Sequence, residues 1–293
     1  MTVKTAVTDH RTGIRLAAVG VLVLSFDALL IRLADVGHWD VAFWRGALMA
    51  LSMGLVALIR TQPAEWQHCR KHPLVLFFLA ALYGINGTLF VLSVSFTSVA
   101  NTVVILSSSA FFAALFSWWI LREKVARRTW GAILVSIAGV LTVFAGSMGL
   151  SNWLGDLFAL VLALSMGLLL TLMRVYAGLP RTLMIAMSGL VMVSLVAPFS
   201  TPFTLPGDSY IWLLLMGLVQ IPLASVLLMS ATRYLSSPEV SLFLLIETVF
   251  GPIWVWLFLN EQVPAMTFWG GCAILGAVTV HSWLSLKRPI SKN

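Results

Sequence analysis

The sequence predicts an all-α polytopic membrane protein with ten transmembrane helices, arranged as two inverted repeats of five helices. Three observations lead to this fold class: an apolar composition, ten apolar windows of spanning length, and an internal similarity at an offset of 138 residues. Of the 293 residues, 60% are hydrophobic and only 10% are charged, and the mean hydropathy is +0.98. Because a soluble domain carries about 25% charged residues, this composition is typical of a chain embedded in lipid.

Each predicted helix is a window of about 20 apolar residues, the length that crosses the hydrocarbon core. The connections are short, so successive helices are expected to be antiparallel neighbours. The first window is longer than a signal-peptide core, contains Asp27 and lacks a small-residue cleavage pattern, so we expect it to be retained. In chain order the windows are 14–34, 39–59, 73–94, 98–120, 128–147, 154–175, 181–199, 209–231, 239–259 and 266–286.

The basic residues predict an orientation, because cytoplasmic loops are enriched in Lys and Arg. With the N-terminus in the cytoplasm, all 18 Lys and Arg residues except Arg32 and Arg45 fall in inner segments. We therefore expect a multi-pass protein of the plasma membrane, the inner membrane in a bacterium, with both termini cytoplasmic. This topology also explains the net charge of +7, so no nucleic-acid partner is expected.

An internal repeat appears when the chain is shifted by 138 residues. The same residue types recur at one spacing in both copies, and a Trp-Gly pair follows each copy. The matching pairs are Leu106 and Leu244, Phe112 and Phe250, Trp118 and Trp256, Leu121 and Leu259, Glu123 and Glu261, and Val125 and Val263. Since the copies lie five windows apart and five is odd, the second copy must cross the membrane in the opposite sense.

The charges around the repeated glutamates agree with this inversion. Glu123 stands in the cation-rich stretch 122–128, which is expected in the cytoplasm, whereas the stretch 260–266 around Glu261 has no cation and is expected outside. We therefore expect two inverted five-helix units, residues 14–147 and 154–286. Inverted repeats are typical of transporters, in which two pseudosymmetric halves rock about a central site.

Several motifs give the chain a family resemblance. The stretch 234–241, Tyr-Leu-Ser-Ser-Pro-Glu-Val-Ser, followed by Glu247 and by Leu-Asn-Glu at 259–261, resembles the second EamA repeat of the drug/metabolite transporter superfamily. The first-half counterpart is Phe-Thr-Ser-Val-Ala-Asn at 96–101 with Leu-Arg-Glu at 121–123. Gly-Asp at 155–156 and Arg45 also resemble residues of that family. The likeness covers about 14–286.

This resemblance implies an exporter of amino acids or other metabolites, and the aromatic amino acid exporters are the group it is most similar to. The chain departs from the family pattern at two places where the family often has Pro, because it has Ala110 and Thr248 there. Gly251-Pro252 lies one turn later. The position of a helix break therefore cannot be transferred from the family, although the fold can.

Charged residues at membrane depth are the first candidates for a transport site, because each costs about 2.5–3.5 kcal/mol to insert. Glu247 lies near the middle of its window and could titrate a proton or bind an amine. It could also serve only packing, as a neutral or hydrogen-bonded acid. Asp27 lies nearer the outside and could pair with Arg45 or Arg32. Arg45 could attract a substrate carboxylate, form an ion pair or extend to the outer headgroups.

Neutral polar and aromatic residues at similar depth complete the candidate substrate-binding and coupling set: Tyr83, Asn86, Ser108, Gln220 and Trp254. A serine in a spanning helix often only holds helices together, and the two amides are stronger candidates because each has four hydrogen-bonding capacities to satisfy. Glycine and proline at 84, 87, 222, 251 and 252 could loosen helices beside a cavity, or allow close packing. We expect windows 1, 3, 4, 6, 8 and 9 to line that cavity.

Other function classes lack their motifs. The sequence has no His-Glu-x-x-His, no Gly-x-Ser-x-Gly, no metal-ligand cluster and no phosphate-binding Gly-rich loop, so we expect no enzyme activity, metal or cofactor. The expected partners are a small-molecule substrate and the lipid bilayer, with protons as the candidate coupling ion. A channel or an uncoupled facilitator is the alternative function. The sequence leaves substrate, coupling, direction and oligomeric state open.

Overall fold

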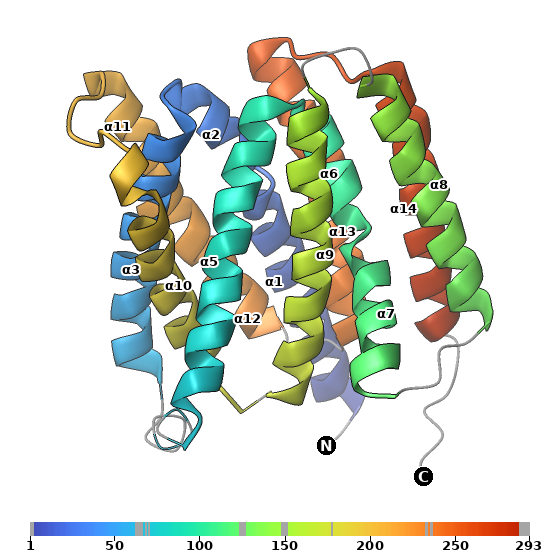
Figure 1. Cartoon of the computed structure of the whole chain (residues 1–293). Coiled ribbons are helices and arrows are strands. Elements are labelled where there is room, and N and C mark those ends of the chain that lie inside the picture. The colour runs from blue at the N-terminus through green and yellow to red at the C-terminus, as the bar shows by residue number, and fades with distance from the viewer. Residues whose placement is uncertain are drawn as a thin grey trace.

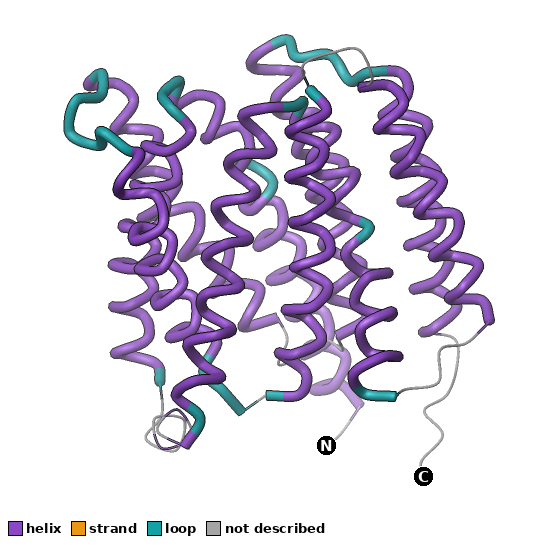
Figure 2. Tube along the Cα trace, in the orientation of Figure 1, coloured by secondary structure: helices purple, strands orange, loops and turns teal. Residues whose placement is uncertain are grey.

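The computed structural model describes residues 3–61, 67, 69, 71–122, 127–147, 152–176, 178–231, 234 and 237–286. Within these residues the regular structure is helical and no strand occurs (Figure 2). Seven helices are long and apolar enough to cross a membrane, and three shorter apolar helices, Trp130–Gly146, Ile246–Leu259 and Ala265–Val280, lie in the other predicted windows. The predicted all-helical class is confirmed.

The helices form one bundle, with α3 and α10 at one side and α8 and α14 at the other (Figure 1). The first half contains α1 (Val3–Leu24), α2 (Asp27–Ala34), α3 (His38–Arg60), α5 (Pro73–Phe96), α6 (Val99–Ser107), α7 (Ser109–Ile120) and α8 (Arg127–Ser147). The second half contains α9 (Trp153–Val175), α10 (Arg181–Val196) with a 3-10 turn (Ala197–Phe199), α11 (Gly207–Leu214), a π-helical turn (Leu215–Gln220), α12 (Ile221–Ala231), α13 (Ser237–Leu259) and α14 (Ala265–Leu286).

Two predicted windows are interrupted within the bundle. The first window breaks at Ser25 and Phe26, between α1 and α2, and the fourth breaks at Ser108, between α6 and α7. Figure 2 shows both links as short teal segments between helices. The eighth window is helical throughout but contains the π-helical turn, which ends at Gln220. By contrast, α13 continues through Pro252, where the sequence suggested a loosened helix.

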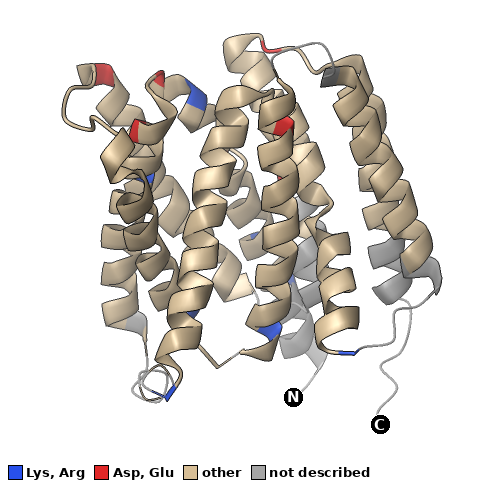
Figure 3. Ribbon diagram, viewed as in Figure 1, with Lys and Arg blue, Asp and Glu red and all other residues tan. Residues whose placement is uncertain are grey.

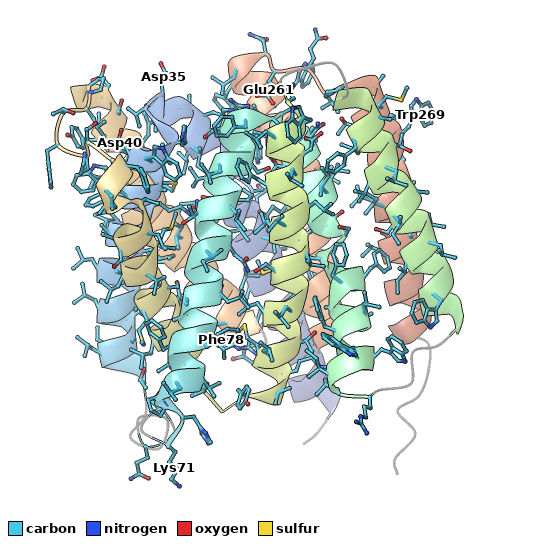
Figure 4. The ribbon with its side chains drawn as sticks, in the orientation of Figure 1. Asp35, Asp40, Lys71, Phe78, Glu261 and Trp269 are labelled. Atoms are coloured by element: carbon cyan, nitrogen blue, oxygen red, sulfur yellow. The ribbon has the colours of Figure 1, made fainter. Side chains whose placement is uncertain are left out.

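The two ends of the bundle differ in charge. α1 begins and α14 ends at the same end (Figure 1). Lys71 lies at that end, whereas Asp35, Asp40 and Glu261 lie at the other (Figure 4). The acidic residues drawn in red gather towards the end without the termini (Figure 3). This arrangement is compatible with the predicted topology.

Glycines bring two helix pairs into backbone contact. A Cβ on Gly46 of α3 would lie 2.9 Å from the carbonyl oxygen of Gly189 on α10. A Cβ on Gly270 of α14 would lie 2.7 Å from the carbonyl oxygen of Gly139 on α8. Because small residues allow helices to approach closely in lipid, where the hydrophobic effect does not drive their association, these contacts hold both pairs together.

The packing relates the two halves of the chain. α1 packs against α12, and α9 packs against α5. The first predicted window of each half therefore contacts the third predicted window of the other half. The backbone is left-handed at Arg122, with φ 54°, and at Asn260, with φ 55°. These residues are 138 positions apart and each precedes a repeated glutamate. Of those glutamates, Glu261 is described, and Glu123 lies outside the described residues.

Candidate functional site

An ion pair inside the bundle joins the first two windows. Asp27 is the first residue of α2, and Arg45 lies in the second turn of α3. Arg45 Nη1 lies 2.5 Å from Asp27 Oδ1, and the side chains are 12% and 5% exposed. The guanidinium carbon lies 5.6 Å from the ring centre of Phe90 on α5. Burying a charge is costly unless it has a partner, so the pair offsets part of the cost of placing both side chains inside the bundle.

Glu247 and Tyr83 belong to the same electrostatic group. Glu247 on α13 interacts with both Asp27 and Arg45 through space, and Tyr83 on α5 interacts with all three. The side chains of Glu247 and Tyr83 are both half-buried. Among the described residues Glu247 makes no hydrogen bond or ion pair, so its carboxylate is free for a ligand.

Gln220 and Ser25 stabilise the interruption in the first window. The Gln220 side-chain nitrogen donates to the carbonyl oxygens of Val23 and Leu24, each at 3.3 Å. The Ser25 hydroxyl donates to Leu22 O at 2.7 Å. Since a break leaves the last carbonyls of a helix without partners, these contacts replace the missing helical bonds. The Gln220 side-chain oxygen, in contrast, is buried and has no hydrogen-bond partner.

Trp254 covers the same interruption from α13. Its ring stacks on Phe26 with centroids 4.6 Å apart and planes 15° apart. Its indole N–H donates to the Ser25 hydroxyl at 2.9 Å. Trp254 therefore fixes the two residues that separate α1 from α2, and an apolar wall forms beside Asp27.

Asn86 and Ser108 make their hydrogen bonds to other groups than the ion pair. Asn86 is 3% exposed and directs its amide nitrogen to Met166 Sδ, 4.0 Å away on α9, while its side-chain oxygen has no partner. Ser108 donates its hydroxyl to Ile105 O at 2.6 Å, within its own segment. The Ser108 hydroxyl is therefore used in a hydrogen bond to the backbone at the break between α6 and α7.

The helix over 39–59 was not among the expected lining helices, yet it contributes Arg45 to the ion pair.

A second polar contact lies at the end of the bundle away from the termini. Arg32 Nη2 lies 3.3 Å from Glu261 Oε2 and donates to Thr97 O at 2.9 Å. The other oxygen of Glu261 accepts the backbone N–H of Val99 at 2.8 Å, at the start of α6. The internal repeat identified Glu261 in the sequence but not its partners, because they lie far away along the chain.

Of the two possible partners of Asp27, the structure selects Arg45.

A buried network surrounds Asp156, a residue that the sequence singled out only by family likeness. Asp156 is 0% exposed, and its Oδ1 accepts from the Thr97 hydroxyl at 2.7 Å and from the Asn101 amide at 2.9 Å. Thr267 on α14 donates to the oxygen of the same Asn101 amide. The network therefore connects α6, α9 and α14. Among the described residues, no group of three or more His, Cys, Asp or Glu side chains is placed to hold a metal ion.

Comparisons with known proteins agree with this architecture. The sequence profile of the EamA-like transporter family matches twice, over residues 11–145 and 153–283. The pseudopaline exporter CntI of Pseudomonas aeruginosa, in two strains, is 25% identical over 277 residues, which cover 91% of this chain and 94% of the relative. A solved crystal structure of a protein aligns with a TM-score of 0.63 at 15% identity, over 96% of this chain and 99% of the other. That structural likeness shows the fold alone.

Proposed function

Because this chain belongs to the EamA-like transporter family, we propose that it is a secondary transporter that exports a small zwitterionic metabolite by alternating access. An amino acid, aromatic or otherwise hydrophobic, or a compound built from one, is the proposed substrate. The relative CntI exports pseudopaline, so this compound belongs among the substrates to be tested.

The observation that carries the proposal is the Asp27–Arg45 pair with Glu247 beside it. Charges at this depth are costly, so a membrane protein that keeps them commonly uses them on the pathway of a substrate or ion. The group offers one cation for a carboxylate and two carboxylates for an ammonium, and Phe26, Trp254 and Phe90 supply apolar surface near it. This combination suits an amino acid better than an inorganic ion or a neutral sugar.

We also propose that the chain crosses the membrane ten times, as the inverted units 14–147 and 154–286. The two separate matches of the family profile support this division. So do the reciprocal contacts of α1 with α12 and of α9 with α5. With the cation-rich end in the cytoplasm, the protein would lie in the inner membrane with both termini inside, and Glu261 would face outwards.

Transport in proteoliposomes tests the proposal. The purified protein is reconstituted, and uptake of a panel of radiolabelled amino acids and of pseudopaline is measured with and without a pH gradient. We expect saturable uptake that is accelerated when the vesicles are preloaded with unlabelled substrate, as a carrier requires. Uptake without such acceleration would instead identify a channel. A flux that ignores the pH gradient would exclude proton coupling but not transport.

Glu247→Gln tests the site itself. It removes the unpaired carboxylate and keeps the size of the side chain, so we expect the flux to fall at least tenfold while expression and elution are unchanged. Asp208→Asn makes the same chemical change on an exposed residue at the start of α11 and is the matched control. Undiminished flux through Glu247→Gln would contradict the assigned role.

A further inference from the structure

Asp156 is a buried acid that the proposed transport site does not use. It lies in the first turn of α9 and is 0% exposed. Its Oδ1 accepts two hydrogen bonds, from the Thr97 hydroxyl and from the Asn101 amide, whereas its Oδ2 is buried without a hydrogen-bond partner. The ion pairs found among the described residues do not include Asp156. The two oxygens of this carboxyl group therefore have different environments.

This asymmetry matches a carboxyl group that carries a proton on Oδ2. An ionised carboxylate accepts hydrogen bonds at both oxygens and is costly to bury when one of them has no partner. The two donors on Oδ1 serve both forms, because the carbonyl oxygen of the neutral acid also has two lone pairs. The forms differ at Oδ2, where an unpaired O–H costs less than an unpaired negative charge.

The burial of Asp156 also limits which cation can bind to it. Because the residue is 0% exposed, no space of the size of a water molecule adjoins Oδ2. A Cβ on Gly155 would lie 2.5 Å from the backbone nitrogen of Thr97, so the backbone of α9 lies directly against the segment between α5 and α6. A metal ion needs room for several oxygen ligands. A proton needs no such room, so it is the cation that fits here.

Thr97 connects this acid to the ion pair at the end of the bundle away from the termini, where Glu261 lies (Figure 4). We call this end the Glu261 end. The Thr97 hydroxyl donates to Asp156, and the Thr97 carbonyl oxygen accepts Arg32 Nη2 at 2.9 Å. The same nitrogen lies 3.3 Å from Glu261 Oε2. The contacts that close this end and those that bury Asp156 meet at one residue, so opening the end would bring water to Asp156.

Few other titratable side chains lie near Asp156. Arg32 and Glu261 reach it through Thr97, and the His38 ring lies 5.0 Å from the ring of Phe96, the residue before Thr97. Among the elements packed against this network, α6 and α7 contain no titratable residue. Those of α5, α8, α14 and the rest of α9 stand several helical turns away along their helices, and they are Tyr83, Arg127, Arg128, His281 and Arg174.

We propose that Asp156 is a proton-binding site linked to the closure of the Glu261 end. It holds a proton on Oδ2 while that end is closed and releases the proton to the water that enters when the end opens. The proton is taken up from and returned to the same side, so this site carries no proton across the membrane. Once water is present, the dipole at the start of α9 favours the anion and assists the release. This inference rests on the proposed function, to which it adds control by pH.

Infrared spectroscopy tests for the proton, because a protonated carboxyl group has a carbonyl stretch that an ionised one lacks. The spectra compare Glu247→Gln with and without Asp156→Asn, so that the other unpaired acid does not contribute. We expect a carboxyl band that Asp156→Asn removes and that disappears as the pH is raised. A folded protein without this band, or with a band that persists at every pH, overturns the proposal.

Substrate exchange tests the link to opening. The probe is radiolabelled phenylalanine, or the member of the panel with the largest flux if phenylalanine is not carried, and the pH is equal on both sides of the membrane. We expect the wild-type rate to rise with pH by up to about tenfold per unit, the limit for one linked proton. Asp156→Asn keeps the size of the side chain and has no proton to release. Its rate should stay at every pH at the level of the wild type at low pH.

Two variants are the controls for the pH profile. Asp208→Asn makes the same chemical change on an exposed residue of α11 and should keep the wild-type profile. His38→Gln removes the histidine beside Phe96, a residue type that titrates near neutral pH, and should also keep the profile. If His38→Gln flattens the profile and Asp156→Asn does not, the proposal is overturned.

The two measurements separate this inference from the proposed function. If no member of the panel is transported, the proposed function fails, and the infrared comparison still decides whether Asp156 holds a proton. If substrate exchanges but Asp156→Asn keeps the wild-type profile, the carrier function stands and the proton site is overturned. If Asp156→Asn does not elute as a folded protein, the spectrum of Glu247→Gln decides, since it must contain a carboxyl band that is lost as the pH rises.

Discussion

Arg32 on α2 and Glu261 between α13 and α14 form an ion pair whose acid also accepts the first N–H of α6. The pair lies at the end of the bundle away from the termini, and it joins the first half of the chain to the second (Figure 4). Alternating access requires the two halves to separate at one end at a time. The Arg32–Glu261 contact is placed where it would hold that end of the bundle closed.

Cross-linking tests that closure. In a background that carries Cys69→Ala and Cys272→Ala, Arg32→Cys and Glu261→Cys are bridged with a short thiol cross-linker that a reductant can cleave. We expect the bridged protein to stop transporting, because that end of the bundle cannot open, and to recover on reduction. Each single cysteine variant treated in the same way is the control. Full transport through completely bridged protein would show that the contact does not need to open.

Breaking the Asp27–Arg45 pair should destabilise the protein as well as stop transport. Removing one partner of a buried pair leaves an uncompensated charge, at a cost of about 3–5 kcal/mol. We expect Asp27→Asn or Arg45→Gln alone to lower the unfolding temperature strongly. The double substitution should recover much of that loss but none of the flux, which fluorescence melting and uptake measure separately. If neither single substitution lowers the unfolding temperature, the stability of the fold does not depend on the contact between Asp27 and Arg45.

The glycine contact between α3 and α10 should tolerate no side chain. A Cβ on Gly189 would lie 2.7 Å from the backbone nitrogen of Ala50 and would also press on the carbonyl oxygen of Gly46. We therefore expect Gly189→Ala to reduce the yield of folded protein and lower its unfolding temperature. Gly54→Ala on the same α3 helix has nothing within 4 Å of the added Cβ and should melt like the wild type.

The Asp156 network predicts a difference between two substitutions. Asp156→Asn keeps an oxygen that can accept the bonds from Thr97 and Asn101, so we expect folding to survive with a small loss of stability. Asp156→Leu removes the acceptor of the Thr97 hydroxyl and one of the two acceptors of the Asn101 amide, which also donates to Thr97 Oγ1 at 3.2 Å. A buried donor that loses its acceptor costs about 1–3 kcal/mol. Thermal unfolding in detergent compares the two, and equal melting temperatures would mean that the network contributes little.

Much of the fold is predictable from the sequence because a membrane allows few solutions. A chain in hydrocarbon must satisfy its own backbone, so apolar windows of spanning length are expected to be helices. The interruptions are different. The sequence directed attention to Pro252, yet α13 continues through it, whereas the breaks fall at Ser25 and Ser108, where no proline stands. These breaks depend on partners such as Gln220, which only the folded chain brings near.

The candidate site was predictable in its charges and not in its contacts. Asp27, Arg45 and Glu247 stand out because a charge in an apolar window needs a reason. The choice between Arg45 and Arg32 as the partner of Asp27 depends on the angle between α2 and α3, which no local pattern contains. Ser108 shows the opposite case, since its polar side chain at membrane depth suggested a site, whereas its hydroxyl donates to Ile105 O beside the break.

The two glycine contacts lie on opposite sides of the bundle, with α3 and α10 on the left and α8 and α14 on the right of Figure 1. Backbones that touch cannot slide far past one another without losing that fit. A line through both contacts is thus the natural pivot for any rocking of the halves. The lipids along these two edges would be displaced least during a transport cycle, and the bilayer would have to adapt on the other two faces. The speed of the cycle should then depend on how easily the surrounding lipid deforms in that one direction.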